Sequence, residues 1–250
     1  MAFWGDYHTH TIHSHGKGTI EQNVQQAIAK GLKEIAITDH GFKHMAFNVK
    51  REEWDNIRAE HNSIANKYPQ IKIYLGIESN LYNKKGDIDI ENNDFPLLDI
   101  IVAGYHKWVH KGLGFFVSNT FGLATTKIKN RNTNAFIKAI ERYPIDIISH
   151  PQAGISLDIV EVSNAAANFG TFFELNGKRI PTTDLEFQQI LEKTQVEFIA
   201  NSDAHAVHKV ANYDLPQSII DRVGIPTSRI VNWEKLPNFR SRINKEYASQ

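Results

Sequence analysis

Four of the twelve histidines in this chain of 250 residues lie close together near its start, in the stretch DYHTHTIHSHG at residues 6–16. His8 and His10 are two residues apart, so on a strand both imidazoles point to the same face. Asp203 and His205 repeat this spacing near the other end of the sequence. Imidazole and carboxylate ligands without thiolate suit zinc, manganese or iron in a catalytic site with open coordination positions. With no cysteine in the chain, these residue types indicate a catalytic metal site.

Short runs of β-branched and aromatic residues must position these side chains. They predict buried parallel strands at residues 3–8, 34–38, 71–77, 99–104, 145–149, 171–175 and 196–200. Amphipathic stretches between them predict helices over residues 19–31, 51–68, 134–142, 156–169 and 183–194. Strands that alternate with helices over this length predict an α/β fold, a closed or nearly closed barrel in a single domain over residues 1–250.

Polar residues stand at the carboxyl end of every predicted strand, which is where β/α barrels carry their active sites. They are His8 and His10, Asp39 and His40, Glu78, His106, His150, Glu174 and Asn176, and Asp203 and His205. A lone histidine after a strand is more often a hydrogen-bonded core or loop residue, but convergence at one barrel mouth favours metal binding. A buried carboxylate such as Glu78 would also be costly without a cation beside it. The number of ligands predicts two or three divalent or trivalent ions of zinc, manganese or iron.

At these positions the sequence resembles the PHP (polymerase and histidinol phosphatase) family of metal-dependent phosphoesterases. The motifs occur in order as DYHTHT with HSHGKGTIEQNV, ITDHG, GIESN, ISHP and NSDAH. The resemblance covers nearly the whole chain and implies a distorted seven-stranded (β/α)7 TIM-like barrel. It also implies a trinuclear site, with His8, His10, Glu78 and Asp203 at one metal, Glu78, His106 and His150 at a second, and His15, His40 and His205 at a third.

The remaining histidines and two aspartates have other predicted roles. His13 occupies a position that is often aromatic in the family, so we expect it to line the pocket or bond a neighbour without binding metal. We expect Asp6 and Asp39 to orient adjacent ligands. Surface positions, or positions behind the ligands, are expected for His44, His61, His110 and His208.

The resemblance leads to a mechanistic hypothesis in which a metal-bridging hydroxide attacks phosphorus and no protein nucleophile is required. Glu78, Asp203 and His205 would be the catalytic residues. Arg179 in ELNGKRI is the strongest candidate for a phosphate clamp. Lys178 and Lys107 are further candidates for binding substrate.

Residues 107–131 form an unusual segment that contains no acidic residue. It is predicted to be a basic and aromatic loop insertion that covers the substrate. Alternatively, its aromatics pack on the barrel, or they form a stacking platform for single-stranded nucleic acid. Its basic residues are Lys107, Lys111, Lys127, Lys129 and Arg131, and its aromatic residues are Trp108, Phe115, Phe116 and Phe121.

The formal net charge of zero, from 28 basic and 28 acidic residues, disfavours a nucleic-acid partner without excluding a local basic patch. The start of the chain lacks signal-peptide features and no apolar run has membrane-spanning length, so a cytoplasmic location without a membrane partner is expected. The leading hypothesis is hydrolysis of a small metabolite's phosphate monoester, with L-histidinol phosphate the first named substrate. The alternatives are a phosphodiesterase or 3′–5′ exonuclease acting on nucleic acid or nucleotides, and a non-catalytic module stabilised by metal.

Overall fold

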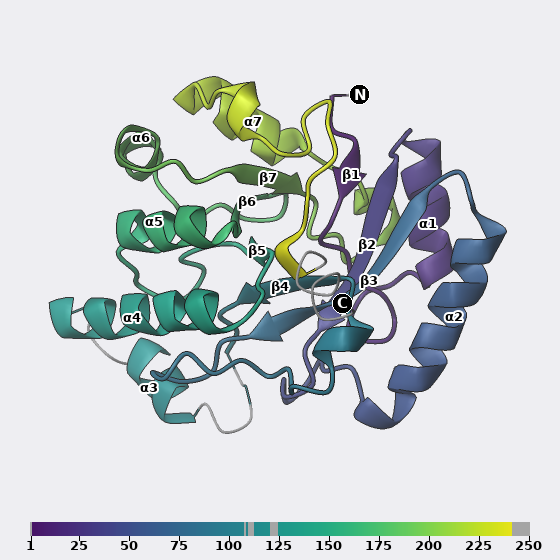
Figure 1. Cartoon of the computed structure of the whole chain (residues 1–250), viewed down its shortest axis with the longest axis horizontal. Helices are drawn as coiled ribbons and strands as arrows, with labels where there is room; N and C mark the ends of the chain where they lie inside the picture. The colour runs from purple at the N-terminus through teal and green to yellow at the C-terminus, as the bar shows by residue number, and fades with distance from the viewer. Residues whose placement is uncertain (1, 108, 110–112, 121–124, 242–250) are drawn as a thin grey trace, which may run out of the picture.

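The computed structural model describes residues 2–107, 109, 113–120 and 125–241. Its strands form one parallel sheet in sequence order, and Thr9 pairs with Ala204 just beyond β1 and β7. The sheet is thus a nearly closed barrel with helices around it (Figure 1), which confirms the predicted distorted (β/α)7 TIM-like barrel. The strands are Gly5–Asp6 (β1), Glu34–His40 (β2), Lys72–Asn80 (β3), Ile100–Gly104 (β4), Ile147–Ile148 (β5), Phe172–Asn176 (β6) and Phe198–Asn201 (β7).

Local capping signals set several helix boundaries. Thr19 and Thr183 each form a capping box with the residue three positions later, which fixes the first turns of α1 and α6. Gly170 and Gly224 adopt left-handed backbone conformations that end α5 and α7. The helices are Ile20–Ala29 (α1), Trp54–Lys67 (α2), Leu113–Thr120 (α3), Thr126–Arg142 (α4), Ile159–Phe169 (α5), Asp184–Lys193 (α6) and Asp214–Val223 (α7), with short 3-10 turns at Arg51–Glu53 (η1), Phe95–Leu97 (η2), Val207–Lys209 (η3) and Thr227–Arg229 (η4).

Helices occupy much of the segment that we expected to be a loop. α3 lies within residues 107–131, and α4 begins at Thr126 rather than at residue 134. The Thr125 side chain accepts a hydrogen bond from the Ile128 backbone N–H and caps α4, while the polar first turns give no apolar period to detect. The Phe115 ring packs 5.7 Å from the Tyr105 ring. Trp108, His110, Lys111, Phe121 and the side chain of Phe116 lie outside the described residues.

The barrel interior changes from apolar to polar along β2, β3, β4, β6 and β7. Because strand side chains alternate between faces, residues two apart share the inward face. Ala36, Tyr74, Val102, Phe172 and Ile199 belong to one buried cluster, separate from the larger core that contains Ile35 and Ile37. Further along the same faces come His40, Glu78, His106, Glu174 and Asp203. The alternation that buries the apolar residues therefore delivers these polar residues to one end.

The C-terminal part of the chain closes the opposite, amino end of the barrel. Phe239 is buried, and its ring lies 5.0 Å from the Tyr7 ring and 5.6 Å from the Tyr74 ring. Glu34 completes this layer by accepting hydrogen bonds from the hydroxyls of Tyr7 and Tyr74. None of the helices in the described part of the chain has the length and apolar character needed to cross a bilayer.

Candidate metal centre

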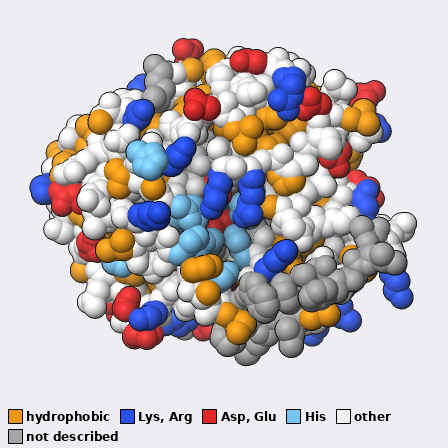
Figure 2. Space-filling model, turned by 180° about the vertical axis from the view of Figure 1, so that it is seen from behind, with side chains coloured by type: hydrophobic (Ala, Val, Ile, Leu, Met, Phe, Trp, Pro, Cys, Tyr) orange, Lys and Arg blue, Asp and Glu red, His pale blue; other side chains and the backbone are white. Residues whose placement is uncertain are grey.

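Histidine and carboxylate side chains converge at the carboxyl end of the strands, where Figure 2 shows a hollow lined by histidines with Lys and Arg side chains around it. The structure brings all nine predicted metal ligands into this cluster. Three groups have ligand atoms within 4.8 Å of one another: His10, His15, His40 and His205; His8, His10 and Glu78; and His40, Glu78 and His106. His150 and Asp203 adjoin these groups, at 3.0 Å from Glu78 Oε1 and 3.4 Å from His10 Nε2 respectively.

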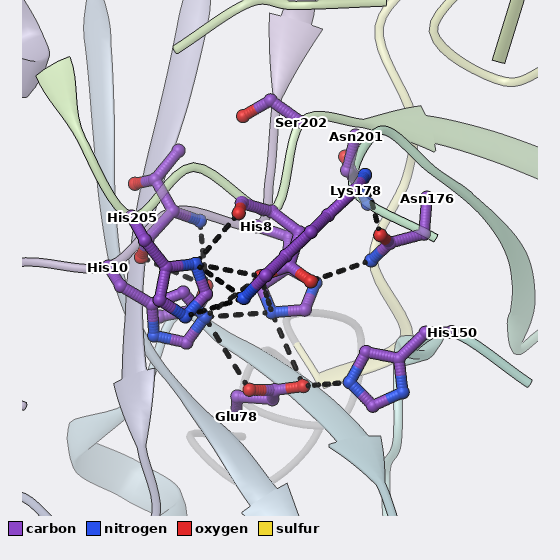
Figure 3. Close-up of polar contacts among 12 residues, drawn as sticks. His8, His10, Glu78, His150, Asn176, Lys178, Asn201, Ser202 and His205 are labelled. Carbon is purple, nitrogen blue, oxygen red and sulfur yellow. Dashed lines mark hydrogen bonds and ion pairs between the residues drawn. The ribbon is translucent and has the colours of Figure 1, made fainter. Parts of the chain in front are cut away.

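Glu78 lies at the centre of the cluster and is almost fully buried. Its carboxylate oxygens are 2.9 Å from His40 Nδ1 and 3.0 Å from His150 Nε2, and the latter contact is visible in Figure 3. Burial alone would raise the pKa of the Glu78 carboxyl, but His106, His8 and His40 hold that pKa well below its usual range. The barrel mouth therefore holds a buried negative charge surrounded by imidazoles.

The donor atoms fit metal ions better than they fit one another. Among the described residues, neither Glu78 oxygen accepts a hydrogen bond, and Nδ1 of His10, His15 and His150 also lacks a hydrogen-bond partner. Each buried polar atom left without a hydrogen bond costs free energy. A cluster of such atoms therefore indicates that they coordinate metal ions. Nitrogen and carboxylate oxygen donors without sulfur match zinc, manganese or iron.

Several of the imidazoles are held neutral, which leaves a lone pair free for coordination. Burial lowers the pKa of His15 to about 3 and that of His106 to about 3. Burial also lowers the pKa of His205. Protons therefore compete weakly for these nitrogens at neutral pH.

Glu174 on β6 is a positioning residue to which the sequence assigned no role. Its Oε1 accepts a hydrogen bond from His8 Nδ1 at 2.7 Å, which turns His8 Nε2 toward Glu78. Its Oε2 accepts from the His150 backbone N–H, also at 2.7 Å. The single buried carboxylate of Glu174 thus fixes the imidazole ring of His8 and the backbone of His150. Carboxylates behind metal ligands commonly have this role.

Asp39 and Asp6 act on the loops that carry ligands rather than on the imidazoles themselves. Asp39 accepts hydrogen bonds from the Thr11 backbone N–H at 2.7 Å and from the Ser14 hydroxyl at 2.5 Å, which shapes the turn between His10 and His15. Asp6 accepts from the backbone N–H groups of Ser202 and Ala211, on either side of Asp203 and His205. The predicted orienting role therefore operates through the backbone.

Two of the predicted ligands have left-handed backbone conformations. The φ angles are 28° at His150 and 51° at Asp203, and such angles are costly for residues other than glycine. Beside His150, Gly104 provides space, because a Cβ there would lie 2.1 Å from Ser149 Oγ and 3.1 Å from His150 Cε1. The fold thus holds the backbone of His150 and Asp203 in costly conformations that place these two side chains in the cluster.

The other histidines are placed apart from the cluster or at its edge. His13 Nε2 bonds Glu60 at 2.9 Å, which agrees with the expected contact to a neighbour. His61 is buried and Nε2 lies 3.2 Å from the Ile73 carbonyl, so the expected position at the surface or behind the ligands is wrong. His208 is exposed.

His44 is a second residue whose role the sequence did not reveal, because it is buried and lines the cavity above the cluster. The backbone N–H groups of Ala46 and Phe47 donate to His44 Nδ1 at 3.2 and 3.1 Å. Nδ1 is therefore the acceptor, and the ring carries its proton on Nε2. Burial lowers the pKa of His44 to about 4, so at neutral pH it offers the cavity a neutral N–H donor.

The cavity above the cluster has a volume of about 520 Å³, and its walls include all three predicted substrate-binding residues, Lys107, Lys178 and Arg179. Lys178 Nζ lies 3.2 Å from both ring nitrogens of His205. Three cations beside a histidine and carboxylate cluster form a site suited to an anionic ligand.

The family model of the PHP domain matches residues 6–205. The chain belongs to the PHP domain family. Among curated relatives, a probable phosphatase of Caldanaerobacter subterraneus subsp. tengcongensis is 30% identical over 91% of this chain and 86% of that protein. A probable phosphatase of Shewanella frigidimarina is 30% identical over 93% of this chain and 90% of its own length. This PHP-domain protein is a metal-dependent phosphatase, a hydrolase of phosphate esters.

Solved structures show the same fold. The histidinol phosphate phosphatase of Lactococcus lactis, complexed with zinc, L-histidinol and phosphate, aligns with a TM-score of 0.62 at 17% identity over 95% of this PHP-domain chain and 97% of its own. The Listeria monocytogenes protein described as a putative histidinol phosphatase aligns with a TM-score of 0.56 at 15% identity over 83% and 97% of the two chains.

Proposed function

We propose that this PHP-domain phosphatase hydrolyses the phosphate monoester of a small metabolite at a trinuclear metal centre. The observation that carries the proposal is the buried Glu78 carboxylate, whose oxygens accept no hydrogen bond from the described residues, within a ring of histidine nitrogens below a cationic cavity. L-Histidinol phosphate is the first named substrate to test, since the similar fold from Lactococcus lactis was crystallised with L-histidinol and phosphate.

The nine clustered side chains would hold the metal ions in three overlapping sets. These are His8, His10, Glu78 and Asp203; Glu78, His106 and His150; and His15, His40 and His205. Metal ions bound there would lower the pKa of a water molecule and neutralise charge on the phosphoryl oxygens. Burial would raise the pKa of Asp203, but His8 and His10 hold it well below its usual range, so Asp203 serves as a carboxylate ligand and not as a proton donor.

The cations of the cavity would bind and orient the phosphate. Lys178, beside His205, would contact the phosphoryl oxygens nearest that imidazole. Arg179 offers a planar pair of donors that matches two phosphate oxygens, and its backbone N–H is tied to Asn176 Oδ1 at 3.0 Å. Lys107 lines the cavity after β4, from a different side of the barrel mouth.

The test is a phosphate-release assay in which manganese, zinc and iron are supplied separately to metal-free protein. We expect turnover of L-histidinol phosphate or another small monoester and of p-nitrophenyl phosphate, without digestion of labelled single-stranded DNA. DNA digestion without monoester turnover would replace the proposal with the exonuclease alternative. No turnover of either, with metal still bound, would favour the non-catalytic module.

A further inference from the structure

A second cavity adjoins the metal centre on the side of β6 and β7, with a volume of about 460 Å³. It shares Lys178, Asp203 and His205 with the cavity above the cluster. Its outer walls come from the loop before α1, which contributes Lys17, and from the η3 region, which contributes Lys209. We call it the lysine cavity. A molecule that spans Lys178 would therefore reach both spaces.

Main-chain contacts fix the walls of the lysine cavity. The Lys17 backbone N–H donates to the His205 carbonyl at 2.9 Å, and that of Lys209 donates to the Ala206 carbonyl at 2.9 Å. Gly177 allows the wall to close, because a Cβ there would lie 2.6 Å from the Asn212 carbonyl oxygen. The Lys17 backbone is thus held against His205, and the Lys209 backbone is fixed within the turn that follows His205.

The charge of the lysine cavity is strongly positive in a chain whose formal net charge is zero. None of Lys17, Lys178 and Lys209 forms an ion pair with an Asp or Glu of the described residues. Asp203 is the one acidic residue among the described residues that line it, and it is buried beside His10. Unpaired cations gathered in a concave site attract anions and bind them with charge-assisted hydrogen bonds.

Lys178 separates the two spaces. Its side chain reaches across the cluster toward His205 (Figure 3), so its amine would serve a phosphate in the metal centre. Lys17 and Lys209 are exposed. Their amines are therefore available to bind a different anionic group. One phosphate cannot use all of these cations, whereas a substrate with two anionic groups can.

We propose that the substrate carries a second anionic group, phosphate or carboxylate, which Lys17 and Lys209 bind while the scissile phosphate occupies the metal centre. This inference rests on the proposed function and narrows its substrate class. L-Histidinol phosphate has an amine in place of a second anionic group, so we expect phosphate esters that carry a separate carboxylate or second phosphate to be hydrolysed more efficiently than this compound.

The test uses metal-loaded protein and alkyl phosphates that end in a hydroxyl, a carboxylate or a second phosphate, with spacers of increasing length. In the wild type, kcat/KM should be higher for a two-anion compound than for the matched hydroxyl compound. Lys17→Ala and Lys209→Ala should each reduce this ratio, by about tenfold for a lost hydrogen bond to a charged group, and leave p-nitrophenyl phosphate turnover unchanged. Lys30→Ala removes an exposed lysine at the far end of α1 and serves as the matched control.

A binding measurement separates failure of the inference from failure of the proposed function. Isothermal titration with alkane bisphosphonates and matched alkyl phosphonates gives the affinity ratio without turnover. A ratio that is the same in wild type, Lys17→Ala and Lys209→Ala would overturn the second-anion site, whatever the catalytic result. If no phosphate ester is hydrolysed but the ratio falls in both variants, the proposed function is wrong and the anion site stands. The carboxylate and phosphate compounds distinguish the two sources of the second charge.

Discussion

The side chain of Glu174 on β6 holds His8, which follows β1, through a hydrogen bond of 2.7 Å between Oε1 and Nδ1. The same carboxylate accepts from the Asn176 and Asn201 side-chain amides at 2.8 and 3.0 Å. These donors surround both oxygens, so the orientation of the His8 ring is determined before any ligand arrives.

Glu174→Gln should therefore weaken metal binding without unfolding the barrel. The amide nitrogen would face groups that are themselves donors, and His8 or His150 would shift. We expect metal affinity to fall by about 10- to 100-fold, the usual effect of altering a group behind a ligand, with activity recovered at higher metal concentration. Metal titration followed by a phosphatase assay measures this, and Glu192→Gln on the exposed face of α6 is the control. Unchanged affinity would show that Glu174 has no positioning role.

Glu78→Gln should remove metal and turnover together. The substitution keeps the shape but removes the charge that the surrounding imidazoles share, so metal content measured by mass spectrometry and hydrolysis of p-nitrophenyl phosphate should both be lost. Glu60→Gln, which affects only the partner of His13, should retain both. Activity that survives the loss of metal from Glu78→Gln would refute the proposed mechanism.

His44→Asn should reduce phosphate binding while the metal stays in place. The asparagine oxygen can still accept from the Ala46 and Phe47 backbone N–H groups, but the Nε2–H donor is lost. For one hydrogen bond to a charged ligand we expect kcat/KM to fall by about tenfold, with unchanged metal content. A comparison of kcat/KM with the inhibition constant of inorganic phosphate checks it, and loss of metal from the variant would contradict this interpretation.

Asp146, immediately before β5, should make the stability of the protein depend on pH. Burial raises the pKa of Asp146 to about 6, from 3.8 in an exposed carboxyl. Between these values the folded state binds more protons, so its stabilising contribution is complete below pH 3.8 and is lost as the pH rises through about 6. The difference in unfolding free energy between wild type and Asp146→Asn should fall by about 2 kcal/mol from pH 4 to pH 7. Urea unfolding measures it, with the exposed Asp55→Asn as the control; a difference independent of pH would contradict the prediction.

The ligand cluster was predictable from the sequence because strand alternation and strand ends are local properties. A strand period of two residues was enough to predict that His8 and His10 share a face, and likewise Asp203 and His205. The order of the motifs supplied the remaining ligand positions. The predicted strands lie within a few residues of the observed ones, although β1 and β5 are shorter because only Gly5–Asp6 and Ile147–Ile148 form ladder pairs.

The remaining features depend on contacts that a sequence does not display. Glu174 and His8 are 166 residues apart in the sequence. The sequence predicted that Glu174 lies at a strand end, but it did not identify His8 as its hydrogen-bond partner. His44 gains its orientation from a tight turn with Ala46 and Phe47. The first turns of α4 are polar, so the sequence predicted its start too late. The helix α7 at Asp214–Val223 was also missing from the predicted helices, although Gly224 marks its end.

The first and last strands of the barrel lie side by side, and this has a consequence for biosynthesis. The His10 backbone N–H bonds the Ala204 carbonyl at 2.8 Å, so the wall that carries the first histidines is completed by residues made much later. A ribosome that has released only the early strands presents His8 and His10 without Asp203 or His205. The cluster that surrounds Glu78 therefore cannot assemble until synthesis has passed residue 205, and the nascent chain must handle any metal ion with an incomplete set of ligands until then.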